Sequence, residues 1–271
     1  MTLAVVTDST ACLPAPLARE AGITVVEVPV AQGTSSRPAV VELQEAYRHA
    51  LGQADEVLAV HISAALSGTV DNARLAAAAL GQDSGRVRVL DSGSAGAGIG
   101  FAALAAATAT DLRRGEALAR ESAARSTVLL LAGDLGRLSR GGRLDRGTAL
   151  KGGTLGMRPI LQVTGAGIQA VETVRGAARA RRHLLSRALQ AAGVGQGSTP
   201  RPPAVPVRVA VHHAQAQQEA EDLLAELRTA LHDGGATVTT TLCAPVDAAT
   251  EVHVGAGSLG VVVAPVVGAA S

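Results

Sequence analysis

The chain has 271 residues, of which 47% are hydrophobic and 17% are charged, so its length suits about two domains or one large one. Its 24 Lys and Arg residues nearly balance 23 Asp and Glu residues, and a formal charge of +1 gives no general attraction to nucleic acid or anionic lipid. One Tyr, one Phe and no Trp also argue against the recognition of bases by stacking. We therefore expect no nucleic acid partner.

Short strands alternate with amphipathic helices through the first half of the sequence. Aliphatic, often β-branched runs that end in Gly, Ser, Asp or Pro predict buried strands over residues 3–6, 23–30, 56–62, 86–90 and 127–132. Apolar residues at three- and four-residue spacing predict helices over residues 14–21, 41–51, 70–80, 95–113 and 115–125. This alternation predicts an α/β domain in three layers, with helices on both faces of a mostly parallel sheet.

The pattern changes after a stretch rich in Gly and Arg at residues 136–146. Residues 159–163 and 168–174 flank a turn and predict a β-hairpin, which a basic helix over residues 175–191 follows. After a loop rich in Pro and Gly, further elements are predicted as strands 207–212, 237–243 and 258–263 and a helix 215–233. We expect an N-terminal α/β domain over residues 1–155 and a C-terminal α/β domain with a mixed sheet over residues 156–271.

The two cysteines indicate neither a disulfide framework nor a metal site. Cys12 and Cys243 are far apart in the sequence and have no Cys-x-x-Cys or Cys/His ligand spacing. A cytoplasmic setting fits this usage best. Residues 95–109 form the longest weakly polar stretch, which is too short and too rich in Gly, Ala and Thr to span a bilayer, so we expect no stable membrane insertion.

Two predicted strands end in an Asp-Ser pair, at Asp8 and at Asp91. In an open α/β sheet, ligands usually bind at the carboxyl ends of the strands. An Asp-Ser pair there is also an ordinary N-cap for the next helix, and we favour this structural role. The alternative is a small-molecule phosphotransferase or hydrolase that uses both carboxylates, although the sequence has neither a Walker loop nor an Asp-x-Asp nucleophile.

The segment after the third predicted strand places Ser67 and free backbone amides at the start of a helix. Such a helix end attracts anions, so a carboxylate or phosphate could bind the Ser67 hydroxyl and the amides of Gly68 and Thr69. Ser67 could equally serve only as a cap for its own helix. A polar segment at residues 33–38, which includes three adjacent hydroxyls and Arg37, could close on the same anion or could be simple turn chemistry.

His253 is the histidine best suited to bind a ligand. It lies beside a glycine-rich turn between two strand-like runs, where the backbone can approach a ligand closely and the ring can donate to an oxygen. Two apparent motifs are rejected. The glycines at residues 93–100 do not have the order of a dinucleotide-binding loop, and the surroundings of Ser258 lack the first Gly of a nucleophile elbow.

Six motifs, in this order, resemble those of the DegV family of bacterial fatty acid-binding proteins. They are Thr7-Asp8-Ser9-Thr10, Leu66-Ser67-Gly68-Thr69, Asp91-Ser92, Leu138-Ser139-Arg140-Gly141-Gly142-Arg143-Leu144, Met157-Arg158-Pro159-Ile160-Leu161 and His253-Val254-Gly255-Ala256-Gly257. The resemblance covers nearly the whole chain. It implies two α/β domains with a lipid pocket between them that holds one long-chain fatty acid.

The resemblance also implies a role for particular residues. It implies a lipid-binding protein without catalysis, with the fatty acid as its ligand and with no cofactor and no metal. A separate fatty acid kinase would act on the bound acid to make acyl phosphate for phospholipid synthesis. The residues implied to bind the carboxylate are Thr34, Ser35, Ser67, Gly68, Arg143 and His253, and the residue implied to dock the kinase is Arg175.

The chain departs from the family pattern at one motif. The family's Thr-Ser-Gln-Pro corresponds best to Ser35-Ser36-Arg37-Pro38, so a Thr is replaced by Ser and a neutral Gln by Arg. Thr34 could instead fill the role of the family's threonine. The segment between Pro29 and this motif is also shorter than in the family.

Overall fold

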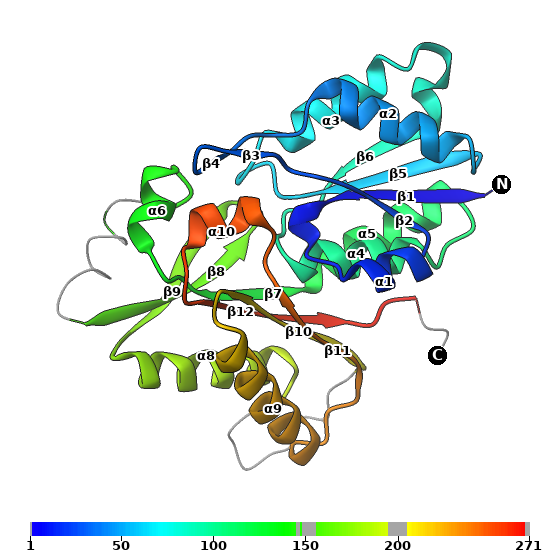
Figure 1. Ribbon diagram of the computed structural model, residues 1–271. Helices are drawn as coiled ribbons and strands as arrows, with labels where there is room; N and C mark the ends of the chain where they lie inside the picture. The colour runs from blue at the N-terminus through cyan, green and yellow to red at the C-terminus, as the bar shows by residue number, and fades with distance from the viewer. Residues whose placement is uncertain (1, 145–146, 148–155, 195–204, 269–271) are drawn as a thin grey trace. The chain divides into compact units, whose positions relative to one another are not determined.

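The computed structural model describes residues 2–144, 147, 156–194 and 205–268 (Figure 1). The chain forms two compact units. The first consists of Met1–Arg125, Asp247–Ala249 and Val267–Ser271, and the second of Ser126–Val246 and Thr250–Val266. Among the helices of the described ranges, none is both long enough and apolar enough to cross a membrane.

A four-stranded parallel sheet forms the centre of the first unit. Its strands, in spatial order, are β2 (Ile23–Val26), β1 (Leu3–Asp8), β5 (Glu56–His61) and β6 (Val87–Asp91). Its helices are α1 (Ala15–Glu20), α2 (Val40–Leu51), α3 (Thr69–Ala78), α4 (Ala97–Ala106) and α5 (Leu112–Arg125), with short 3-10 turns η1 (Ser9–Ala11) and η2 (Gly81–Arg86). The predicted parallel sheet is confirmed.

Helices cover both faces of this sheet, which gives three layers (Figure 1). On one face, α2 and α3 bury Leu43, Tyr47 and Ala73 against the strand residues Val6 and Val57. On the other face, α4 and α5 pack against β1, β5 and β6. The apolar stripe of α2 recurs at three- and four-residue spacing, which is why its prediction from the sequence is sound.

The predicted helix over residues 95–113 is wrong in its length. The structure ends α4 at Ala106 and begins α5 at Leu112. The Asp111 carboxylate accepts a hydrogen bond from the Arg114 amide at 2.9 Å, as an N-cap does, and so starts a new helix. The sequence predicts a break between the two helices at residue 114, whereas the break lies at residues 107–111.

A six-stranded mixed sheet forms the centre of the second unit. In spatial order its strands are β11 (Val238–Pro245), β10 (Val207–Ala214), β12 (Ser258–Pro265), β7 (Thr127–Leu131), β8 (Met157–Thr164) and β9 (Gly167–Arg175). Its helices are α6 (Leu135–Arg140), α8 (Ala177–Ala191), α9 (Gln217–Asp233) and α10 (Ala248–Val254). The predicted mixed sheet and the predicted β8–β9 hairpin are confirmed.

The strand at residues 127–132 belongs to a different sheet from the one expected. The alternation of strands and helices predicts that it joins the first parallel sheet, whereas β7 lies between β12 and β8 and is antiparallel to both. An aliphatic run predicts a buried strand but does not identify its neighbours. The predicted domain boundary at residues 155/156 borders the range 148–155, which lies outside the described residues, and it stays a prediction.

Buried His212 makes the stability of the protein depend on pH. Its pKa is lowered to about 4, mainly by burial and also by the neighbouring His213, while the hydrogen bond from Nδ1 to the Ala244 carbonyl acts in the opposite direction. Between an unfolded pKa of about 6.5 and this value, the unfolded chain binds more protons, so stability falls as the pH falls. We expect a loss of about 2 kcal/mol from this residue between pH 7 and pH 5. Urea denaturation over this range should show a shallower pH dependence for His212→Gln, and an unchanged slope would contradict the assignment.

Candidate functional site

Asp8 ends β1 in a fully buried position, where its carboxylate accepts several hydrogen bonds. Oδ1 accepts from the amide of Thr10 at 3.1 Å and from the Thr10 hydroxyl, so Asp8 is the N-cap of η1. Oδ2 accepts from the Ile62 amide at 3.1 Å and from His61 Nδ1 at 2.9 Å. The predicted capping role is confirmed. The link to His61 was not predicted from the sequence.

Tyr47 extends this buried cluster. Its hydroxyl lies 3.1 Å from His61 Nε2, and both side chains are fully buried. Burial and the nearby Asp8 carboxylate raise the pKa of Tyr47, so the phenol keeps its proton and shares a hydrogen bond with Nε2. His61 Nδ1 in turn donates to the Asp8 carboxylate. The result is an ordered relay of hydrogen bonds from Tyr47 through His61 to Asp8.

A second acidic side chain, Asp91, holds the loop that follows β5. Its Oδ1 accepts from the Ala64 amide at 3.1 Å and from the Gly93 amide at 2.9 Å. Ser63 lies between Ile62, which Asp8 binds, and Ala64, and its amide donates to the Ser94 carbonyl at 3.0 Å. Both acids therefore use their oxygens to shape this loop, an arrangement that does not favour their use as catalytic carboxylates.

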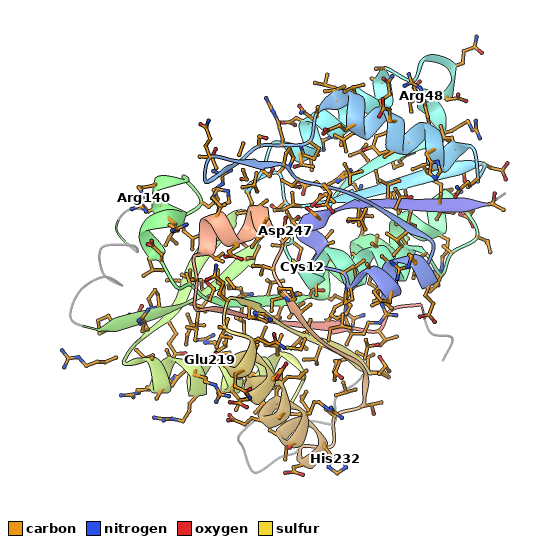
Figure 2. All side chains as sticks on the ribbon, in the orientation of Figure 1. Cys12, Arg48, Arg140, Glu219, His232 and Asp247 are labelled. Atoms are coloured by element: carbon orange, nitrogen blue, oxygen red, sulfur yellow. The ribbon has the colours of Figure 1, made fainter. Side chains whose placement is uncertain are left out.

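Cys12 follows the turn η1 at the end of β1. Figure 2 shows its side chain near Asp247, and burial together with the Asp247 charge raises the pKa of the Cys12 thiol to about 12. Asp247 Oδ2 also accepts from the Ser9 hydroxyl at 3.0 Å. A thiol with this pKa stays protonated at neutral pH and is a poor nucleophile. Both Cys12 and Cys243 are free thiols.

The loop leads to Ser67 and Gly68 at the start of α3. Ser67 Oγ lies 2.9 Å from the Thr69 hydroxyl and accepts from the Thr69 amide at 3.3 Å, so it holds the first residue of α3. The N-cap itself is Gly68, and no side chain caps the helix there. The amides of residues 62–67 all donate to acceptors in this loop or beside it. Gly68 follows them, and its amide donates to no acceptor among the described residues. That amide and the Ser67 hydroxyl can face an anion together.

A tight hairpin carries Thr34 and Ser35. They form β4 (Thr34–Ser35), which pairs with β3 (Val30–Ala31) through the turn residues Gln32 and Gly33. Both turn residues have positive φ, 50° and 73°, as a type I′ turn requires. The Thr34 hydroxyl donates to the Ala31 carbonyl at 2.9 Å and so helps to close the turn. The predicted strand over residues 23–30 thus ends at Val26 and resumes only as this hairpin.

Arg37 follows the hairpin and reaches Gly68. A Cβ atom at Gly68 would lie only 2.8 Å from the Arg37 guanidinium nitrogen Nη1 and 3.2 Å from its Cδ. Asn72 of α3 donates to the Pro38 carbonyl at 2.8 Å and ties this segment to the helix. The polar segment at residues 33–38 therefore brings a cation to the same helix start as Ser67.

In the second unit, Gly141 lies against both Arg143 and His253. A Cβ atom at Gly141 would lie 3.1 Å from His253 Nδ1 and 3.4 Å from Arg143 Nη1, and this arginine nitrogen donates to the Gly141 carbonyl. Two side chains predicted to bind the ligand, although distant in the sequence, thus share one glycine. The absence of a side chain at Gly141 allows this approach.

His253 differs from expectation in its backbone. It lies in the last turn of α10, whereas the sequence predicts strand-like runs on both sides of a turn. Gly255, with φ of 78°, follows the helix and donates its amide to the Glu251 carbonyl at 2.9 Å, as a left-handed C-terminal residue does. The run Val252-His253-Val254 is too short for its β-branched residues to exclude a helix.

Ser258 is buried and has a structural role beside this turn. Its hydroxyl donates to the carbonyls of Val254 and Gly255 and accepts from the Gly133 amide at 2.9 Å. Gly133 approaches Ala256 so closely that a Cβ atom there would overlap the Ala256 carbonyl oxygen. This packing fixes the turn after His253.

Two other features of the second unit lie apart from these residues. Arg175 is exposed at the end of β9, opposite Met157 in the hairpin register. An open pocket of about 650 Å³ lies between α9 and β11, and Arg228 and His232 are among its lining residues. None of the predicted carboxylate-binding residues lines that pocket.

Comparisons with known proteins agree with the motif analysis. A model of the DegV family, described as uncharacterised proteins, matches residues 31–266. A DegV domain-containing protein of Streptomyces coelicolor is 34% identical over 291 aligned residues, which cover 96% of this chain and 98% of that protein. The crystal structure of a DegV family protein from Corynebacterium glutamicum matches with a TM-score of 0.84 and 29% identity, over 97% of both chains. A fatty acid-binding DegV family protein from Thermus thermophilus matches with a TM-score of 0.80 and 28% identity, over 98% of this chain and 100% of that one.

Proposed function

The chain belongs to the DegV family, and we propose on that basis that it binds one long-chain fatty acid as a carrier, without catalysis of its own. The observation that carries this proposal is the similarity, over nearly the full length, to the fatty acid-binding protein of Thermus thermophilus. The alternative, a phosphotransferase or hydrolase built on Asp8 and Asp91, is not favoured, because both carboxylates already accept backbone hydrogen bonds.

Burial of the tail would supply most of the affinity. A chain of sixteen to eighteen carbons has about 14–16 methylenes, and at about 0.8 kcal/mol each their burial is worth about 11–13 kcal/mol before entropy is subtracted. A buried carboxylate without partners costs several kcal/mol, so the groups around it serve mainly to cancel that cost. They would select acids over other molecules with the same tail.

We assign the carboxylate to groups from both parts of the sequence. Ser67 would contribute a hydroxyl and Gly68 a backbone amide. Thr34 and Ser35 would contribute further hydroxyls. Arg143 and His253 would contribute side-chain N–H donors. The fatty acid would be the ligand, with no cofactor and no metal. Support comes from the amide of Gly68, which donates to no acceptor among the described residues, and from the shared contact of Arg143 and His253 with Gly141.

The wider role follows the family resemblance. The protein would act in the cytoplasm and present the carboxylate to a separate fatty acid kinase, which would form acyl phosphate for phospholipid synthesis. Arg175, exposed at the end of β9, would dock that kinase.

We expect denaturing mass spectrometry of the protein purified from bacteria to release a long-chain fatty acid. Ser67→Ala combined with His253→Ala should weaken the binding of added fatty acid at least tenfold, because the carboxylate loses two donors. A matched control, Ser84→Ala with His49→Ala, changes the same residue types at positions without a predicted role and should bind normally. Release of no fatty acid, together with no binding on addition, would overturn the proposal.

A further inference from the structure

We propose that Arg37 binds the carboxylate and makes the site selective for fatty acids over uncharged lipids with the same tail. This inference rests on the proposed function and assigns to it a residue that the family motif does not supply. The site would then combine the Arg37 guanidinium with the hydroxyl of Ser67 and the amide of Gly68.

The position of Arg37 is fixed by its neighbours. Its guanidinium lies against the backbone of Gly68, the residue whose amide donates to no acceptor among the described residues. The next residue, Pro38, accepts a hydrogen bond from Asn72 in the first turn of α3 at 2.8 Å. The Ala39 amide then donates to Glu42 Oε2 at 2.9 Å as α2 begins. The two residues directly after Arg37 are thus held by hydrogen bonds, Pro38 by a residue of α3 and Ala39 by a residue of α2.

Among the described residues, none balances the charge of Arg37. Within the described residues, no acceptor forms a hydrogen bond or ion pair with its guanidinium. Other arginines of the first unit are paired, such as Arg120 with Glu116 at 2.7 Å and Arg125 with Glu121 at 2.7 Å. Asp71, the acidic residue in the first turn of α3, pairs with Arg74 instead, with 3.7 Å between Oδ1 and Nη1.

The groups around this point all carry a positive charge or partial charge. The guanidinium, the amide of Gly68 and the positive end of the α3 dipole all favour a negative group at the same point. A planar guanidinium also matches the two oxygens of a carboxylate and carries a positive charge. A Gln at this position would carry no charge. An alcohol headgroup would gain little from Arg37, because it carries no charge.

The test compares two ligands with the same tail, oleate and oleyl alcohol, in equilibrium binding to the full chain. We expect Arg37→Gln to weaken oleate binding about fivefold to tenfold and to change oleyl alcohol binding less than about twofold. Arg37→Lys should restore part of the oleate affinity. The loss in the glutamine variant should shrink at high salt, where an exposed charge is screened.

Arg48→Gln is the matched control. Arg48, labelled in Figure 2, is an exposed arginine in the last turn of α2, so its replacement removes the same charge from the same unit. It should leave the affinity for both ligands unchanged. If wild-type protein binds oleate and Arg37→Gln binds it equally well, or loses both ligands equally, the assignment of Arg37 is wrong. If wild-type protein binds neither ligand, the proposed function itself fails.

Discussion

Replacing Asp8 with Ala is expected to lower the free energy of unfolding by about 3–5 kcal/mol. The substitution removes the acceptor for the His61 ring and for the amides of Thr10 and Ile62, all inside the protein. A buried donor that loses its partner costs its full desolvation energy, which exceeds the gain from forming the bond in the native protein. The same change releases the first residue of the loop that leads to Ser67.

Urea denaturation measures this loss, and a second acidic residue of the first unit supplies the control. Asp83 forms an exposed ion pair with Arg86 at 2.8 Å, and Asp83→Ala should change stability by less than about 1 kcal/mol. Tyr47→Phe should have an intermediate effect, because it removes only the hydrogen bond between Tyr47 and His61. An Asp8→Ala variant within 1 kcal/mol of wild type would show that the cluster contributes little to the fold.

Replacing Gly133 with Ala is expected to cost about 3 kcal/mol of stability and to weaken fatty acid binding. The added Cβ would overlap the carbonyl oxygen of Ala256 and lie 2.9 Å from its carbon. Both atoms belong to backbone, which cannot rotate away as a flexible side chain can. The turn after α10 must therefore move, and His253 is in the last turn of that helix.

Gly165→Ala is the control for this change. Gly165 lies in the β8–β9 turn of the same unit, and a Cβ atom there would meet nothing within 4 Å. Thermal unfolding should place this variant close to wild type, whereas Gly133→Ala should unfold at a clearly lower temperature. Equal unfolding temperatures for the two variants would mean that the turn at Ala256 yields without cost.

The sequence predicts the parallel sheet well because its strands are continuous aliphatic runs that end in polar residues. It does not predict the Asp8–His61 pair, because that contact depends on strand register. Thr7 of β1 lies opposite Val60 of β5, and this pairing brings the next residues, Asp8 and His61, together. No local pattern in either strand contains that information.

The candidate site also has parts that the sequence predicts and parts that it does not. Ser67 and Gly68 are predictable, since a hydroxyl and a glycine at the start of an amphipathic helix form a local pattern. The approach of Arg37 to Gly68 is not, because it depends on the hydrogen bond from Asn72 to the Pro38 carbonyl. The helical backbone at His253 depends likewise on Gly255, which ends α10 in a left-handed conformation.

The hydroxyl of Tyr47 gives this protein an internal optical reporter. Tyr47 is the single tyrosine of the chain, and no tryptophan is present to accept its excitation energy or to mask its emission. Its ultraviolet fluorescence therefore originates from one phenol, whose intensity is sensitive to the hydrogen bond with His61. Unfolding of the core around α2 can thus be followed spectroscopically in the unlabelled protein, without a dye or a fused domain.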